Sequence, residues 1–235
     1  MNQKRVIVTG GGRGIGRAVC ERFARDGAQV MSASRTQAEL DETRRAILQR
    51  GGRCETHRAD VTSAADVKSL IATTIDRFGG VDVLVNCAGV APRASIEDLD
   101  ATLFDTILST NARAVYLGCH AAWPVMKRQG EGVIVNISSI ASVDPFPGFT
   151  AYGAAKAWVN AWSKGLAAEG RGAGIRVFCV APGAVETAML RGPFPDFPKD
   201  QTLNPSHVAD VVCALCQPDC RYATGQTVFV QRQGD

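Results

Sequence analysis

The sequence places two serine hydroxyls, a phenol and an ammonium between residues 138 and 156: Ser138, Ser139, Tyr152 and Lys156. A phenol with an ordinary pKa of about 10 exchanges protons poorly at neutral pH, and a neighbouring ammonium lowers that pKa by favouring the phenolate. We therefore expect Tyr152 to act as acid and base, Lys156 to lower its pKa, and a serine to hold a substrate oxygen. The alternative is that a tyrosine and a lysine stand four residues apart by chance, so the rest of the chain decides.

Two regular elements would carry these groups. Residues 132–137 form a short apolar run rich in β-branched side chains, which predicts a buried strand ending at the serines. Apolar residues recur at helical spacing after Thr150, a possible N-cap. On such a helix Tyr152 and Lys156 lie on one face, about one turn apart.

A second strand and helix enclose a glycine-rich turn near the N-terminus. The apolar run 5–9 is followed by Gly10, Gly14 and Gly16 and then by an amphipathic stretch, 17–26. Glycines let the backbone approach a pyrophosphate, whose charge the helix N-terminus receives. A glycine turn alone is a weak signal, but the strand before it and the helix after it are the context that a nucleotide site requires.

The same alternation of strand and helix continues to the C-terminus. It predicts further strands at 28–33, 53–58, 81–86, 175–180 and 227–230, and helices at 37–50, 64–78, 99–127 and 205–216. Together these elements predict a single α/β domain over residues 1–235, with a seven-stranded parallel sheet and helices on both faces. Ligands of such a sheet bind at the carboxyl ends of the strands, where the glycine turn and Ser139 both fall.

Composition argues against several classes of partner. The chain has 235 residues, 46% of them hydrophobic, and a net charge of +3 with basic and acidic residues interspersed. This distribution lacks the basic stripe of a nucleic-acid-binding protein. No apolar run reaches the roughly 18 residues of a membrane span and no signal sequence precedes the first strand, so we expect no membrane association and a cytoplasmic location.

The cysteines cluster only once, at Cys213, Cys216 and Cys220, among eight that are otherwise scattered. A metal or redox site there is the alternative to reduced core residues. We expect no metal, because the first two lie in a helical pattern and no further pair of cysteines or histidines completes four ligands.

Ordered motifs run through nearly the whole chain. They are Thr9-Gly10-x3-Gly14-Ile15-Gly16, Asp60-Val61, Asn86-Cys87-Ala88-Gly89, Asn111, Ser139, Tyr152-x3-Lys156 and Pro182-Gly183-x3-Thr187. In these motifs the chain resembles the short-chain dehydrogenase/reductase (SDR) family, and within it the NADP-dependent branch of 3-oxoacyl-ACP reductase-like ketoreductases. The resemblance implies a single-domain Rossmann fold and a catalytic tetrad of Asn111, Ser139, Tyr152 and Lys156. In that family the tyrosine protonates a carbonyl oxygen as hydride arrives from the nicotinamide, the lysine also binds the nicotinamide ribose, and the asparagine holds a water of the proton relay.

The resemblance also implies which residues bind the cofactor. They are Gly10, Arg13, Gly14, Ile15, Gly16, Ser34, Arg35, Asp60, Val61, Asn86, Ala88, Gly89, Tyr152, Lys156, Pro182, Gly183, Val185 and Thr187. Plainer alternatives stay open: Asp60 could serve only the start of a helix capped by Ser63, and Asn86, Gly89 and Asn111 could be local structural residues. Cys87 replaces the family's more usual second asparagine. The family's usual acidic-Gly-Gly ending is absent, which weakens inference about C-terminal subunit contacts.

The end of the second strand bears on the choice of cofactor. NAD-specific sites place an acidic residue about 20 residues beyond the glycine turn, where it accepts a hydrogen bond from the ribose 2′-OH. Here Ser34 holds that position and no carboxylate is near. Arg35 and Arg13 could converge on a 2′-phosphate, so we predict NADP as the cofactor, against the alternative that both arginines are solvated surface residues.

The leading prediction is therefore an NADPH-dependent carbonyl reductase, reversible as an alcohol dehydrogenase. The alternatives are a non-catalytic dinucleotide-binding sensor or scaffold, NAD-linked alcohol oxidation, and the extended branch of the same fold, which modifies nucleotide sugars. The intact tetrad opposes the scaffold, and the short stretch after Pro182 opposes the extended branch. Small residues around the helices at 111–127 and 150–169 predict a homodimer or homotetramer, since the family commonly pairs these helices across a twofold axis.

Two segments rich in proline and aromatic residues, 143–149 and 188–198, are predicted to flank the phenol. Their large apolar side chains would form a wall for a hydrophobic substrate: Phe146, Phe149, Met189, Leu190, Phe194 and Phe197. Arg191 and Asp144 are the only polar candidates there. The alternative is that the phenylalanines pack into the core or a subunit interface. We predict small apolar or aromatic ketones and aldehydes as substrates.

Overall fold

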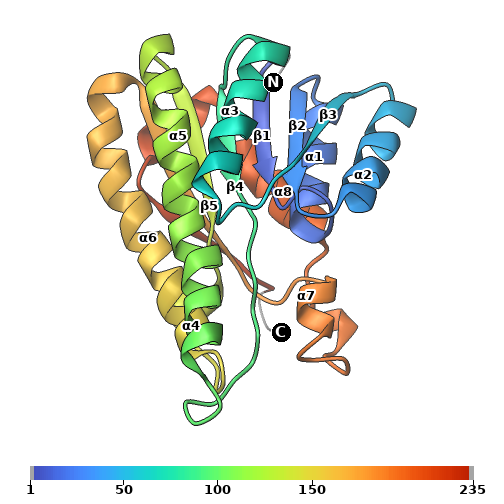
Figure 1. Cartoon of the computed structure of the whole chain (residues 1–235), viewed down its shortest axis with the longest axis vertical. Coiled ribbons are helices and arrows are strands. Elements are labelled where there is room, and N and C mark those ends of the chain that lie inside the picture. Colours follow the sequence, from blue (N-terminus) through green and yellow to red (C-terminus); the bar gives the residue numbers. More distant parts are fainter. Residues whose placement is uncertain (1–2, 233–235) are drawn as a thin grey trace.

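The computed structural model describes residues 3–232 and contains one seven-stranded sheet (Figure 1). The strands, all parallel, lie in the order β3-β2-β1-β4-β5-β6-β7. They are β1 (Arg5–Thr9), β2 (Gln29–Ser34), β3 (Arg53–Arg58), β4 (Val83–Asn86), β5 (Gly132–Ile137), β6 (Ile175–Pro182) and β7 (Thr227–Val230). The predicted α/β class and parallel sheet are confirmed.

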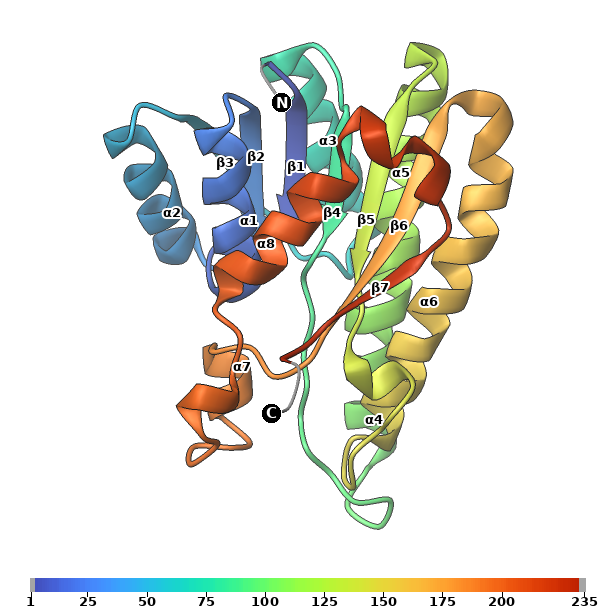
Figure 2. The ribbon, with the colours of Figure 1, turned by 180° about the vertical axis from the view of Figure 1, so that it is seen from behind.

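Helices cover both faces of this sheet (Figures 1 and 2). One face packs against α1 (Gly14–Arg25), α2 (Gln37–Gln49) and α8 (Pro205–Leu215). The other packs against α3 (Ala64–Phe78), α5 (Ala114–Gln129) and α6 (Thr150–Gly170). Side chains of a strand point alternately to the two faces, so Val6 and Val8 join the first core and Ile7 joins the second.

The predicted helix 99–127 is divided in the structure. Helix α4 (Ala101–Leu108) is followed by a π-helical turn, η1 (Ser109–Arg113), and then by α5. The amide of Ala114 donates to the carbonyl of Ser109, five residues earlier, which widens the helix by one residue. Hydrophobic periodicity predicted the helices but not this turn, because inserting one residue barely changes the apolar pattern.

Two expectations about helix starts have opposite outcomes. Ser63 caps α3, since its hydroxyl accepts from the amide of Asp66 and donates to the Asp66 carboxylate. Thr150 does not cap α6: the helix begins at Thr150 itself, after Phe149, and has no side-chain cap. That prediction was wrong because the preceding loop turns into the helix one residue earlier than the apolar pattern indicated.

The smaller elements gather near the carboxyl edge of the sheet or in loops. They are η2 (Ile140–Ser142), η3 (Arg171–Ala173), α7 (Ala188–Arg191), η4 (Lys199–Gln201) and η5 (Pro218–Ala223). No group of three potential metal ligands occurs within residues 3–232, and Cys213 and Cys216 are buried in the core. None of the helices in this part of the chain is long and apolar enough to cross a membrane.

Candidate active site

A cavity of about 1110 Å³ opens at the carboxyl ends of the strands. The glycine turn, the ends of β4, β5 and β6, the first turns of α6 and the segment 182–201 all contribute to its walls. It is lined by all four predicted catalytic residues and by every predicted cofactor-binding residue except Asn86. Distant motifs of the sequence therefore meet in one place.

The glycine turn between β1 and α1 is shaped to approach a ligand closely. Gly10 and Gly14 have positive φ angles of 70° and 53°. A Cβ at Gly16 would lie 2.1 Å from the carbonyl oxygen of Gly10, so this position excludes any side chain. Helix α1 begins after Arg13 without a side-chain cap, which leaves backbone N–H groups available for a pyrophosphate. The residues present therefore fit a dinucleotide.

Asn86 departs from its expected role in cofactor binding. Its side chain is buried, its amide donates to the Asn136 side chain at 2.8 Å, and the Asn136 amide in turn donates to Ser163 at 2.9 Å. Gly118 of α5 packs against it. Because its amide group faces the interior, Asn86 joins β4, β5 and α6 and does not line the cavity.

Asp60 lies both at the cavity and at the start of α3. It lines the cavity beside Val61. One carboxylate oxygen accepts hydrogen bonds from the backbone amide and the hydroxyl of Thr62, at 2.9 and 2.8 Å, and its backbone amide donates to Asp66 at 2.9 Å. The start of α3 thus holds Asp60 at the cavity wall.

Beside the glycine turn the structure contradicts one step of the cofactor argument. Arg13, Ser34 and Arg35 line the same part of the cavity, as predicted, but Glu39 from the first turn of α2 lines it as well. The Glu39 carboxylate lies 3.5 Å from the Arg13 guanidinium. The statement that no carboxylate is near was wrong, because α2 folds back over the turn and returns a residue that follows Ser34 in the sequence to its side.

Tyr152 and Ser139 face each other across the end of β5. Burial raises the pKa of the Tyr152 phenol, and the nearby Ser139 hydroxyl opposes this by lowering it. The expected lowering by Lys156 is not observed: the ammonium lies 5.7 Å from the centre of the Tyr152 ring and is turned to a carbonyl oxygen. The phenol consequently stays protonated at neutral pH, which is the form that donates a proton.

Lys156 is almost fully buried, with 4% of its surface exposed. Its ammonium donates to the carbonyl of Ile137 at 2.8 Å, and its own carbonyl accepts from the Ser138 hydroxyl at 3.0 Å. Burial lowers the pKa of Lys156 to about 8. Ser138 is thus committed to the backbone of α6, while Ser139 remains beside the phenol.

Asn111 lies in the π-helical turn and is fully buried at the cavity wall. Its amide donates to the carbonyls of Val90 and Ile107 at 2.9 and 3.0 Å, and its side-chain oxygen accepts from the Val90 amide at 3.2 Å. A Cβ at Gly89 would lie 2.8 Å from that oxygen and 3.6 Å from the Lys156 ammonium. A π-turn in a helix often marks a functional site, and here it brings Asn111 next to the loop after β4.

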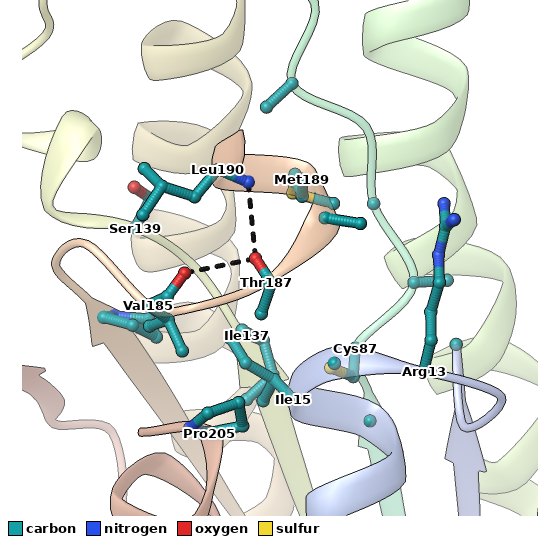
Figure 3. Close-up of a pocket in the computed structure, with 18 of the residues that line it drawn as sticks. Arg13, Ile15, Cys87, Ile137, Ser139, Val185, Thr187, Met189, Leu190 and Pro205 are labelled. Atoms are coloured by element: carbon teal, nitrogen blue, oxygen red, sulfur yellow. Dashed lines mark hydrogen bonds between the residues drawn. The ribbon is translucent and has the colours of Figure 1, made fainter. Parts of the chain in front are cut away.

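The segment after β6 closes the other side of the cavity (Figure 3). Thr187 caps α7: its hydroxyl donates to the carbonyl of Val185 at 3.2 Å and accepts from the amide of Leu190 at 3.3 Å. Backbone hydrogen bonds pin Leu203 against residues 184–186, so residues 187–202 form a loop closed at its neck.

The predicted apolar wall is present in the cavity, since Phe146, Phe149, Met189, Leu190, Phe194 and Phe197 all line it. Arg191, expected as a polar group of this wall, is not among the lining residues. Its guanidinium binds Glu186 at 2.8 Å and the carbonyls of Pro195 and Phe197 at 3.0 and 2.6 Å. Arg191 therefore braces the loop from within.

Arg93, which the sequence interpretation missed, lines the cavity near this wall. It lies in the loop between β4 and α4, a stretch without periodicity. The one available signal was its place after the carboxyl end of a strand, where loops carry functional residues.

The geometry defines a dinucleotide-binding oxidoreductase site, and comparisons with known proteins agree. The profile of the short chain dehydrogenase family matches residues 4–196. The 2-(R)-hydroxypropyl-CoM dehydrogenase of Xanthobacter autotrophicus is 38% identical, with 95% of each chain covered. The chain therefore belongs to the short-chain dehydrogenase/reductase family.

Two solved structures show the same fold with different cofactors. A variant of actinorhodin polyketide ketoreductase with NADPH superposes with a TM-score of 0.93 at 28% identity, covering 98% of both chains. The 3-ketoacyl-(acyl-carrier-protein) reductase of Brucella melitensis, complexed with NADH, gives 0.90 at 32% identity and covers 98% of this chain and 97% of the other. Likeness of fold alone thus leaves open the choice between the two nicotinamide cofactors.

The burial of Lys156 predicts a characteristic pH dependence of stability. Its pKa is about 8 in the fold, against an ordinary value of 10.5, so between these pH values the unfolded chain binds the additional proton and stability rises with pH. Between pH 8 and 10.5 we expect the unfolding free energy of the wild type to rise by roughly 2–3 kcal/mol more than that of Lys156→Met. Urea unfolding of both proteins measures this difference. Thiols that do not interact with Lys156 titrate alike in both proteins and cancel, whereas Cys87 and Cys179 lie near the ammonium. A difference that stays constant with pH would contradict the prediction.

Proposed function

We propose that this protein is an NADPH-dependent carbonyl reductase, reversible as an alcohol dehydrogenase. The observation that carries the proposal is the meeting of Ser139, Tyr152 and Lys156 in a cavity that the glycine turn also lines, where Gly16 leaves no room for a side chain. A scaffold without activity would have no use for a buried ammonium, whose lowered pKa reports a cost to the fold.

The residues divide the reaction between them. A reduced nicotinamide dinucleotide, when bound, supplies the hydride that reaches the carbonyl carbon. Tyr152 donates its phenolic proton to the carbonyl oxygen, so that C=O becomes CH–OH, and Ser139 holds that oxygen as charge develops on it. In the pattern of the family, Lys156 would also bind the nicotinamide ribose, and Asn111 would hold a water through which the phenol regains its proton. Burial raises the pKa of Tyr152 and keeps the phenol protonated, which is the form that can donate to a carbonyl oxygen.

Tyr152→Phe tests this assignment directly. The variant lacks only the proton donor, so we expect kcat for ketone reduction to fall at least about a hundredfold while the Kd for NADPH stays nearly unchanged. Loss of NADPH absorbance measures turnover, and the fluorescence of bound NADPH measures affinity. Near wild-type turnover in this variant would refute the mechanism.

The preference for NADPH rests on Arg13 and Arg35, which line the cavity where the adenosine ribose would lie. Two guanidiniums can make charge-assisted hydrogen bonds to a 2′-phosphate. Glu39 opposes them, since it pairs with Arg13 and places a like charge beside that phosphate. The preference should therefore be moderate, with NADH still accepted.

Exchanging these charges should move the preference in opposite directions. Glu39→Gln removes the repulsion, and we expect the affinity for NADPH relative to NADH to rise roughly fivefold. Ser34→Asp with Arg35→Ile should shift the preference toward NADH. Glu42→Gln is the matched control, because Glu42 lies on the same helix and pairs with Arg17 at 2.9 Å. Equal use of NADH and NADPH by the wild type would contradict the proposed preference.

For the substrate we propose small apolar or aromatic ketones and aldehydes. Phe149 stacks on Phe194 with ring centres 5.6 Å apart, and Phe149 meets Tyr152 edge-on at 6.2 Å. An apolar surface thus leads up to the phenol, and it favours the burial of a hydrophobic body beside the reacting carbonyl. A cytoplasmic location remains a prediction from the sequence.

We further propose a homodimer or homotetramer built on α5 and α6, which lie side by side in Figure 1. Their outer surface exposes Tyr116 and Trp158, at 39% and 38%, together with Ala161 and Gly165. Aromatic residues next to small ones favour close packing with a second copy of the same surface. We expect light scattering at micromolar concentration to give at least twice the mass of the chain, and a monomer would exclude this interface.

A further inference from the structure

Arg93 is held toward the cavity by its packing against a glycine. A Cβ at Gly148 would lie 2.9 Å from Cγ and 3.3 Å from Nε of Arg93, so only glycine leaves room for the arginine. Gly148 also has a positive φ of 85°, and its carbonyl accepts from the amide of Ala94 at 2.9 Å. The loop after β4 and the loop before α6 are thereby joined at this arginine.

The guanidinium stands at the outer end of the aromatic wall. Its central carbon lies 6.0 Å from the centre of the Phe194 ring. Phe194 stacks on Phe149, which in turn meets Tyr152. A continuous apolar path therefore connects the proton donor with a cation, and a substrate whose carbonyl is at Tyr152 extends along this path toward Arg93.

The charge of Arg93 is not neutralised by the protein. Within residues 3–232 its guanidinium forms no ion pair. Arg93 itself is exposed, and two carboxylates that also line the cavity do not pair with it: Glu186 is bound by Arg191, and Asp144 is exposed. A guanidinium presents up to five N–H donors in a planar fork that matches a carboxylate.

We propose that Arg93 makes this site select carbonyl compounds in which an apolar body separates the reacting carbonyl from an anionic group such as a carboxylate. The inference rests on the proposed reductase function and specifies the charge of its substrate. Arg93 binds the anionic end, the phenylalanines hold the apolar body, and Tyr152 and Ser139 receive the carbonyl.

Two alternative roles, one for Arg93 and one for Asp144, predict different substrate preferences. Arg93 could serve only to fasten the two loops through Gly148 and Phe194, in which case the charge of the substrate would not matter. Asp144, which lines the same cavity, could instead select a cationic group. Pairs of probes that differ only in charge separate these roles from selection of an anion.

The probes are aryl ketones that carry a terminal carboxylate three to eight bonds from the carbonyl, each compared with its primary amide and with the corresponding amine. Binding is measured by calorimetry to the NADPH complex of Tyr152→Phe, in which turnover is slow. At the most favourable separation between the carbonyl and the carboxylate, we expect the acid to bind about tenfold more tightly than its amide. In the double variant Tyr152→Phe/Arg93→Met, the affinity ratio of acid to amide should fall to about one, because methionine retains the packing over Gly148 without the charge. Arg93→Lys keeps a positive charge and should retain part of the preference for the acid.

Asp144→Asn serves as the opposing variant and should increase the preference for the acid, because it removes a like charge from the opening. A ratio of acid to amide near one with every spacer, a preference for the amine, or a ratio that survives Arg93→Met would overturn the proposal. An equal loss of affinity for acid and amide in Arg93→Met would also overturn it, in favour of the fastening role. Turnover of the amides by the wild type tests the reductase separately, and a preference for acids in binding without turnover would contradict the reductase while supporting the role of Arg93.

Discussion

Two hydrogen bonds between the end of β5 and the side of α6 set the geometry on which the site depends. The Lys156 ammonium donates to the carbonyl of Ile137, and the Ser138 hydroxyl donates to the carbonyl of Lys156. Together they fix the rotation of α6 about its own axis. Tyr152, one turn closer to the start of the helix, is thereby directed to Ser139. Burying the ammonium costs stability, as its lowered pKa shows, and this cost is offset by the packing of α6 against the sheet.

The features that could be predicted from sequence are those that follow from local periodicity and from the parallel sheet. Alternating apolar runs predicted the seven strands. The rule that ligands bind at the carboxyl ends of parallel strands then predicted that Gly10, Ser139 and Tyr152 lie close together. The choice of Ser139 over Ser138 came from the resemblance to the family, whose serine lies 13 residues before the tyrosine. The structure supplies its physical reason, because Ser138 is occupied by the helix backbone.

What sequence reasoning missed depends on which way side chains point once loops and helix ends are folded. Glu39 reaches Arg13 because of the angle at which α2 leaves β2. Asn86 faces inward because β4 is covered by α5, and Arg191 turns back on its own loop. No local pattern encodes these directions. The π-helical turn at Asn111 is similar, since one additional residue in a helix leaves almost no trace in its apolar periodicity.

The loop after β6 has a consequence for how this protein could acquire new specificities. Arg191 braces it through Pro195 and Phe197 within the loop and through Glu186 at its neck, where Ala184 and Leu203 join its two ends. The backbone of such a loop is held mainly by its own contacts, and Phe194 packs on Phe149 outside it. Insertions or exchanges between residues 187 and 202 can reshape the entrance while the proton-transfer residues on β5 and α6 keep their positions. Changes in residues 187–202 can therefore alter which substrates are accepted, while the residues that transfer the proton stay the same.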